Sequence, residues 1–174
     1  MKKVVILGSS GSGKSYLSKK LSRELSIEVY HLDNLMRKSD WKPVSYKQKC
    51  DIQKKILSND TWIIEGNYTN ILDERLLEAD TISFLNINKY KCIFNVIKRT
   101  FIYRNKDRPD KPYNAIDKLN LHLLIWTWNF DKNEKPVIIK KVNKFSKTKR
   151  IIILNTIKNI NNYFNNVTNS KLLY

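Results

Sequence analysis

Short runs of apolar residues alternate with longer stretches in which apolar residues recur every three or four positions. A short apolar run is typical of a buried strand, and the longer spacing is typical of a helix with one buried face. The runs predict five strands, over residues 4–7, 28–32, 61–65, 81–85 and 150–154. The periodic stretches predict helices after the first strand and over residues 45–57, 71–78, 89–103, from 115 onward, and 156–164. Strands and helices that alternate in this way predict a parallel sheet with helices on both faces.

A glycine- and serine-rich segment, Gly8-Ser9-Ser10-Gly11-Ser12-Gly13-Lys14-Ser15, joins the first strand to the first helix and fits the pattern G-x-x-x-x-G-K-[ST]. Its glycines let the backbone wrap a phosphate so that successive N–H groups point at it, at the positive end of a helix. We expect these eight residues to bind the phosphates of ATP or GTP. Lys14 is expected to reach the β- and γ-phosphates, and Ser15 to bind Mg²⁺.

The chain has 174 residues, of which 41% are hydrophobic, enough for one sizeable core. We therefore expect one domain over residues 1–174. No apolar run approaches the roughly 18 residues of a transmembrane helix, so a cytoplasmic protein without membrane contact is expected. Cys50 and Cys92 lie far apart without C-x-x-C spacing, and we expect reduced thiols, at least one of them buried.

The formal net charge is +17, which creates a positive field that favours anionic partners. The basic residues are spread along the chain, and no known DNA- or RNA-binding sequence signature accompanies them. DNA is therefore a permitted partner through a basic surface, but no particular interface is predicted.

Polar residues stand at three predicted strand ends: His31 with Asp33, Glu65 with Asn67, and Asn86. Chemistry in parallel sheets lies at the carboxyl ends of the strands. We expect Asp33 to face the phosphate loop, and the alternative is that it caps the following helix. Glu65 ends the strand next to that of the phosphate loop and is expected to hold Mg²⁺ through water.

Further short pieces follow one another along the chain: Tyr30-His31-Leu32-Asp33, Trp62-Ile63-Ile64-Glu65-Gly66-Asn67-Tyr68, Ala79-Asp80-Thr81-Ile82, Tyr103-Arg104, Arg108-Pro109-Asp110 and Trp126-Thr127-Trp128-Asn129-Phe130. In order and spacing they resemble the small P-loop kinases of the adenylate kinase kind, and within them the bacterial topology modulation proteins. The resemblance runs nearly the whole length. It implies an αβα P-loop fold with a five-stranded parallel sheet in adenylate kinase-like order, ATP binding, a short mobile lid around residues 104–114, and an association with DNA topology.

The resemblance also implies roles for individual residues. Asp33 contacts the acceptor or the metal shell, and Glu65 occupies a position similar to the Asp-Gly of adenylate kinases. Arg104 and Arg108 flank the polar segment that resembles a lid, where arginines fold over ATP and neutralise the migrating phosphoryl group. Arg99 is expected to point into the same cleft and bind the nucleotide. Ordinary solvated charges are the alternative for these arginines.

One departure from adenylate kinases concerns the acceptor. Those kinases follow Asp-Gly with Phe-Pro-Arg, whose arginine grips the acceptor phosphate, whereas this chain reads Glu65-Gly66-Asn67-Tyr68. The usual monophosphate clamp is missing at this place. Arg37 and Arg75 are candidates to replace it from neighbouring helices, and a surface or ion-pair role is the alternative for each.

The tryptophans and histidines are assigned from their surroundings in the sequence. Trp62 and Trp126 sit in apolar patterns and are expected in the core, with base stacking as the alternative. Trp41 lies in a polar connection where these kinases bind the acceptor, so we expect it to shape that pocket. His31 and His122 lack a metal-ligand constellation and are expected to be structural.

Two functions follow from these residues. The first is an ATP- and Mg²⁺-dependent phosphotransferase for a small acceptor, in which Lys14 holds the phosphates, Ser15 and Glu65 organise Mg²⁺, and Asp33 orients or deprotonates the acceptor. The second is an ATP-dependent DNA-binding module with little phosphoryl transfer. The identity of the acceptor and the preference for ATP over GTP stay open in both.

Overall fold

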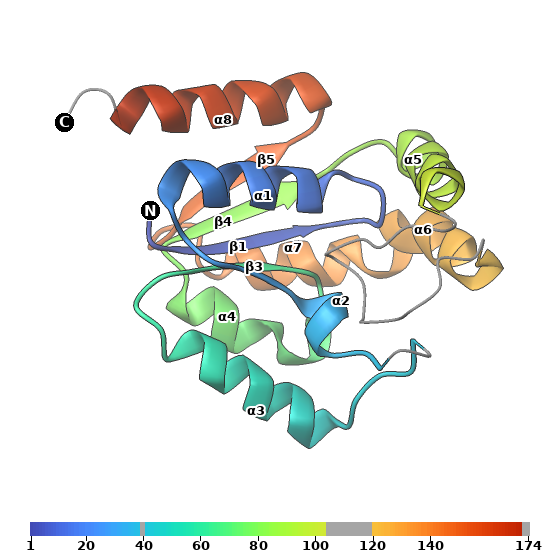
Figure 1. The fold of residues 1–174 in the computed structure, drawn as a ribbon, viewed down its shortest axis with the longest axis horizontal. Helices are drawn as coiled ribbons and strands as arrows, with labels where there is room; N and C mark the ends of the chain where they lie inside the picture. Colours follow the sequence, from blue (N-terminus) through green and yellow to red (C-terminus); the bar gives the residue numbers. More distant parts are fainter. Residues whose placement is uncertain (39–40, 104–119, 172–174) are drawn as a thin grey trace.

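The computed structural model describes residues 1–38, 41–103 and 120–171. Its strands are β1 (Lys3–Gly8), β2 (Val29–His31), β3 (Trp62–Glu65), β4 (Thr81–Leu85) and β5 (Arg150–Leu154). They form one sheet in the order β2-β3-β1-β4-β5, and every neighbouring pair is parallel (Figure 1). The predicted α/β fold class and the adenylate kinase-like strand order are confirmed.

Helices cover both faces of this sheet. In chain order they are α1 (Lys14–Leu25), α2 (Leu32–Leu35), α3 (Tyr46–Leu57), the 3-10 turn η1 (Thr69–Ile71), α4 (Leu72–Glu78), α5 (Lys89–Ile102), α6 (Leu121–Asn133), α7 (Lys135–Asn143) and α8 (Ile157–Lys171). Helices α1 and α8 lie on one face, and α3, α4 and α7 lie on the other (Figure 1). The molecule is therefore a three-layer αβα sandwich.

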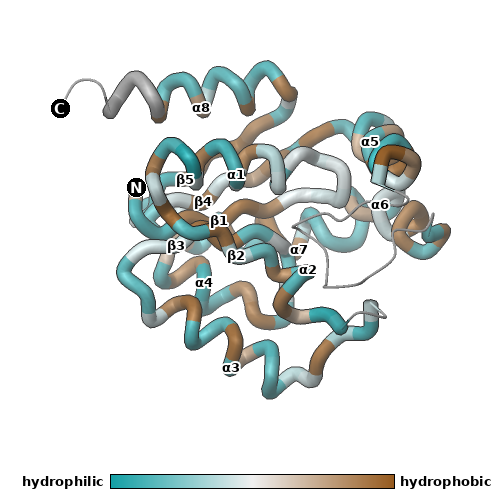
Figure 2. The backbone as a smooth tube through the Cα atoms, in the orientation of Figure 1, coloured by the Kyte–Doolittle hydropathy of each residue, from teal (hydrophilic) through white to brown (hydrophobic). Residues whose placement is uncertain are grey.

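The core consists of two apolar layers, one on each face of the sheet. Alternate residues of β1 point to opposite faces: Val5 and Leu7 belong to one layer, while Val4 and Ile6 belong to the other. All four are fully buried, as expected for a strand covered on both sides. Figure 2 shows hydrophobic residues gathered in the central strands, and hydrophilic residues recurring along α1, α3 and α8. This packing holds the carboxyl end of β1 in a fixed position.

Several expectations about the core are confirmed. Trp62 is fully buried, and the partly buried Trp126 packs against the core and against Phe130, with ring centroids 5.4 Å apart. Cys92 is buried, Cys50 is partly buried, and both are free thiols.

Across residues 1–38, 41–103 and 120–171, every helix is too short or too polar to cross a membrane.

Helix α7 was not predicted as a separate helix, because the sequence expectation placed one helix from residue 115 onward without an end before the last strand. Only Ile138 and Val142 of this helix are buried, and several of its other residues are lysines. Two buried positions are too few to give a recognisable helical pattern of apolar residues in the sequence. Pro136 in the first turn favours a helix start. The expected lid at 104–114, and the expected helix start at 115, lie outside the described residues.

The carboxylate of Asp80 joins the starts of β1 and β4. Its Oδ2 accepts hydrogen bonds from the backbone N–H groups of Lys2 (2.6 Å) and Lys3 (2.9 Å), and its Oδ1 accepts one from the Thr81 hydroxyl (2.7 Å). Burial by itself would raise the pKa of Asp80, but these hydrogen bonds outweigh it and lower the pKa below its usual value.

We expect Asp80→Asn to lower the melting temperature near neutral pH, by an amount that shrinks as the solution is acidified. Because the pKa of Asp80 is depressed in the folded state, its ionised carboxylate stabilises the fold above the unfolded pKa of about 4, and this stabilisation is lost as pH falls through the folded pKa. Thermal unfolding of both proteins at a series of pH values tests this. A difference in melting temperature that stays constant down to strong acid would contradict it.

Candidate functional site

The phosphate loop runs from Gly8 to Ser15 and joins the end of β1 to the start of α1. Its glycines all have positive φ angles, 145° at Gly8, 74° at Gly11 and 98° at Gly13. Glycine enters this region without the steric strain that a side chain would cause. The loop can therefore curl tightly into the start of α1, where the N–H groups of a helix's first turn have no partner further up the helix and can face an anion.

Helix α5 supports the outer side of this loop. A Cβ atom added at Gly11 would lie 2.2 Å from the backbone oxygen of Cys92, so no side chain fits there. The Asn95 side-chain amide donates a hydrogen bond to the Gly11 carbonyl (2.8 Å). Burial raises the pKa of the Cys92 thiol to about 11, which keeps it protonated and unreactive. Contact with α5 thus fixes the path of the loop.

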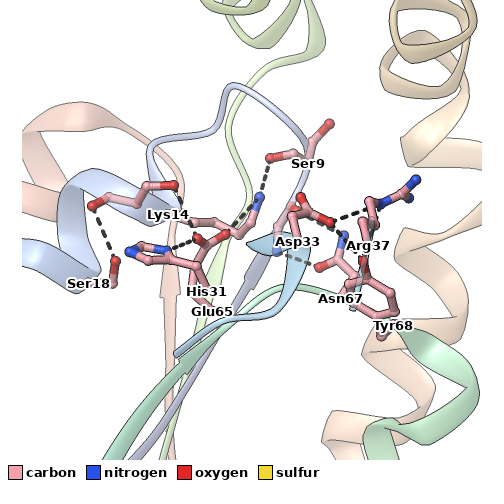
Figure 3. Close-up of polar contacts among 11 residues, drawn as sticks. Ser9, Lys14, Ser18, His31, Asp33, Arg37, Glu65, Asn67 and Tyr68 are labelled. Carbon is pink, nitrogen blue, oxygen red and sulfur yellow. Dashed lines mark hydrogen bonds and ion pairs between the residues drawn. The ribbon is translucent and has the colours of Figure 1, made fainter. Parts of the chain in front are cut away.

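The carboxylate of Glu65 lies at the centre of a group of polar and charged side chains beside the phosphate loop (Figure 3). It is the last residue of β3 and is only 7% exposed. Its Oε2 accepts a hydrogen bond from Ser15 Oγ (3.1 Å) and lies 2.8 Å from His31 Nδ1, while its Oε1 lies 3.7 Å from Lys14 Nζ. Lys14 Nζ also donates to the Ser9 carbonyl (2.9 Å). The three strand ends of β2, β3 and β1 thus bring these side chains together.

The residues present fit a bound phosphate. The hydroxyls of Ser9 and Ser12 are buried in the loop and have no hydrogen-bond partner within the described parts of the chain. A buried hydroxyl without a partner is unfavourable, and phosphate oxygens in the loop would accept hydrogen bonds from both. Both hydroxyls would therefore gain a hydrogen-bond partner if an anion bound inside the loop.

The residues also fit Mg²⁺. Ser15 supplies a hydroxyl and Glu65 a carboxylate, which are the hard oxygen donors that this ion takes. Nowhere in the described ranges do three or more His, Cys, Asp or Glu side chains gather into a metal site of their own. Mg²⁺ is usually bound through one or two side chains together with substrate phosphates, which is the arrangement these two residues would complete.

Asp33 lies on the neighbouring strand end, beyond β2. Helix α2 begins at Leu32 with His31 as its N-cap residue, so Asp33 stands in the first turn and the capping interpretation is wrong. Its Oδ1 accepts a hydrogen bond from the Tyr68 hydroxyl (3.0 Å) and lies 3.4 Å from Arg37 Nε. Arg37 is therefore part of an ion pair at the site, one of the two roles considered for it.

The segment that follows β3 is hydrogen-bonded to the phosphate loop through Asn67. Asn67 Oδ1 accepts from the Gly8 backbone N–H (3.1 Å), and its Nδ2 donates to the Gly8 carbonyl (3.0 Å). These two bonds extend the pairing of β1 and β3 beyond the end of the sheet. The sequence marks Asn67 only as a polar residue at a strand end, and an amide directly after the glycine that follows the strand is the signal for this role.

Arg75 of α4 is fully buried beneath the same segment. Its Nη2 donates to the backbone carbonyl of Asn67, while its Nε and Nη1 have no partner among the described residues. Burial lowers the pKa of this guanidinium. The surface interpretation of Arg75 is therefore wrong, and its observed contact is with the backbone that carries Asn67.

The remaining residues to be located are the three arginines expected at the nucleotide and His31. Arg99 lies half-buried in the last turn of α5, one turn beyond Asn95 and on the same side of the helix. Arg104, Arg108 and the lid lie outside the described residues. His31 was expected to be structural, and its 2.8 Å contact with Glu65 places it in the site instead.

Comparison with known proteins supports the architecture. No protein-family model matches the chain, and no curated protein matches it in sequence. Among solved structures, it is similar to shikimate kinase from Acinetobacter baumannii in complex with shikimate, with a TM-score of 0.65 and 13% sequence identity, over 99% of this chain and 93% of that one. At this identity the likeness shows a shared fold. The chain therefore has the fold of a P-loop kinase, and no link to topology modulation proteins is shown.

Proposed function

We propose that this protein is a Mg²⁺- and ATP-dependent phosphotransferase that moves the γ-phosphate of ATP to a hydroxyl of a small acceptor. The observation that carries the proposal is the convergence of Lys14 and Ser15 on the buried Glu65, beside a loop whose serine hydroxyls lack partners. The shared fold with a solved kinase adds support.

The donor side of the site is built to bind a triphosphate. The amine of Lys14 leaves the Ser9 carbonyl to contact the β- and γ-phosphates, and the hydroxyls of Ser9 and Ser12 donate to phosphate oxygens. Ser15 and Glu65 would hold Mg²⁺, which would supply charge neutralisation to the phosphates. Arg99, Arg104 and Arg108 are proposed to close over the nucleotide from the lid side.

On the acceptor side, Asp33 is proposed to orient the attacking hydroxyl. The hydroxyl oxygen forms a bond to the γ-phosphorus, while the bond between that phosphorus and the bridging oxygen breaks and its electron pair leaves with ADP. The hydroxyl proton passes to the carboxylate of Asp33 and then to water. The products are the phosphorylated acceptor, ADP and one proton. No observation among the described residues favours the DNA-binding alternative.

The test is ADP release from Mg-ATP by the purified protein, with separate pools of sugars, sugar acids, nucleosides, nucleoside monophosphates and amino alcohols, and with duplex DNA. We expect one hydroxylated pool to stimulate release. Asp33→Asn should reduce this stimulation by about a hundredfold, because it removes the base and replaces one carboxylate oxygen with an NH2 group that cannot accept a hydrogen bond. Asp73→Asn is the matched control, since Asp73 is an exposed carboxylate on α4 that pairs with Lys141. Stimulation by DNA alone, or tight ATP binding without turnover, would overturn the proposal.

A further inference from the structure

The phenol of Tyr68 is engaged with both members of an ion pair at the acceptor side of the site. Its hydroxyl donates to Asp33 Oδ1 (3.0 Å) and accepts from Arg37 Nε (3.2 Å), and Arg37 Nε lies 3.4 Å from the same oxygen of Asp33. Figure 3 shows these three side chains beside one another, next to Asn67. One carboxylate oxygen of Asp33 is thus held by two donors.

The second carboxylate oxygen is in a different situation. Among residues 1–38, 41–103 and 120–171, none makes a hydrogen bond to Asp33 Oδ2, and 56% of this side chain is exposed. A carboxylate oxygen without a partner among the described residues, on a side chain that is more than half exposed, can accept a hydrogen bond from a substrate hydroxyl. Asp33 is therefore restrained through one oxygen and available through the other.

The chain holds Tyr68 in a conformation that local preference does not explain. Its backbone lies in the left-handed region, with φ 39° and ψ 62°, which costs a residue other than glycine about 1 kcal/mol or more. Arg75 supports this turn from below, because its buried Nη2 donates to the Asn67 carbonyl and lies 3.5 Å from the Tyr68 carbonyl. Lys49 Nζ lies over the Tyr68 ring, 5.6 Å from its centroid. Strain of this kind persists where the surroundings over-determine it.

The charge state of the phenol suits this arrangement. Burial and the neighbouring Asp33 carboxylate both raise the pKa of Tyr68 above its usual value. The hydroxyl therefore stays protonated at neutral pH and remains a donor to Asp33.

We propose that Tyr68 is a positioning residue for phosphoryl transfer: with Arg37 it holds Asp33 Oδ1, so that Asp33 Oδ2 is presented to the acceptor hydroxyl. This inference rests on the proposed function. In the proposed reaction Tyr68 contacts neither the nucleotide nor the γ-phosphate, and it acts only through Asp33. Its removal should therefore lower the rate of transfer without changing the affinity for ATP.

The test is a double-mutant cycle measured as ADP release from Mg-ATP, first with water as the acceptor and then with each pool described above. We expect Tyr68→Phe to lower kcat about tenfold and to leave the KM for ATP unchanged, because one hydrogen bond to the carboxylate is lost. In an Asp33→Asn background the same change should have no further effect. Tyr90→Phe is the control, since Tyr90 is an exposed tyrosine of α5.

The outcomes separate the two proposals. A Tyr68→Phe enzyme as fast as the original, or an effect that is fully additive with Asp33→Asn, overturns the positioning role and leaves the proposed function standing. A raised KM for ATP with unchanged kcat overturns it as well. Absence of any ADP release from the original protein, with water and with every pool, overturns the proposed function and the inference together. Melting temperatures of all variants show whether each has folded.

Discussion

Lys14→Ala is expected to lose at least about a hundredfold in turnover of Mg-ATP while the protein keeps its fold. In the proposed reaction the removed amine compensates the charge of the γ-phosphate, and loss of one such preorganised donor costs about 10²- to 10³-fold in rate. The fold should survive because the loop retains the Asn95 contact to Gly11 and both bonds between Asn67 and Gly8. ADP release and circular dichroism measure the two parts.

Lys19→Ala is the matched control, because Lys19 stands on the same helix and has no contact with Glu65. It should have the activity of the original protein. If Lys14→Ala and Lys19→Ala turn over Mg-ATP equally fast, the activity does not come from the phosphate loop, and the assignment of the donor site falls.

Gly11→Ala is expected to lose nucleotide binding and to be destabilised by more than about 2 kcal/mol. A methyl group at this position meets two penalties: the left-handed backbone, with φ 74°, and a backbone oxygen of Cys92 only 2.2 Å away. Relief of the clash requires a shift of α5 away from the loop, which would break the bond from Asn95 and deform the phosphate site. Denaturant unfolding and the affinity for a fluorescent ATP analogue measure both effects.

Gly13→Ala separates the two penalties. Its φ of 98° is also in the positive region, but the nearest atom to an added Cβ lies 3.7 Å away, at Ile160. This variant should lose only about 1 kcal/mol, the cost of the backbone conformation. Equal destabilisation of Gly11→Ala and Gly13→Ala would show that the contact with α5 is not what excludes a side chain at Gly11.

The strands of the sheet were largely predictable because each one is specified by residues that are consecutive in the sequence. Most residues of each strand are apolar or aromatic and stand together in the sequence, and β4 and β5 begin and end at the expected residues. The phosphate loop is equally local, since eight consecutive residues specify it. Glu65 could be chosen from topology alone, because it ends a strand next to the strand that carries the loop.

The remaining contacts of the site could not be predicted from local sequence patterns. Tyr68 meets Asp33 across 35 positions, and Asn67 meets Gly8 across 59, distances over which apolar periodicity carries no information. Arg75 is misleading for a second reason: arginine is mostly exposed in proteins, and its burial here follows from carbonyl groups that only the folded turn presents.

The order of the strands has a consequence for the dimensions of the reaction. Asp33 follows β2, Glu65 ends β3 and Gly8 ends β1, and these three strands are consecutive neighbours in the sheet. Neighbouring strands lie about 4.8 Å apart, so the ends of β2 and β1 lie about 10 Å apart across β3. The hydrogen bonds between the strands determine this spacing. Substitutions in the connecting loops can change the side chains around these ends, but the sheet keeps the distance between the ends constant.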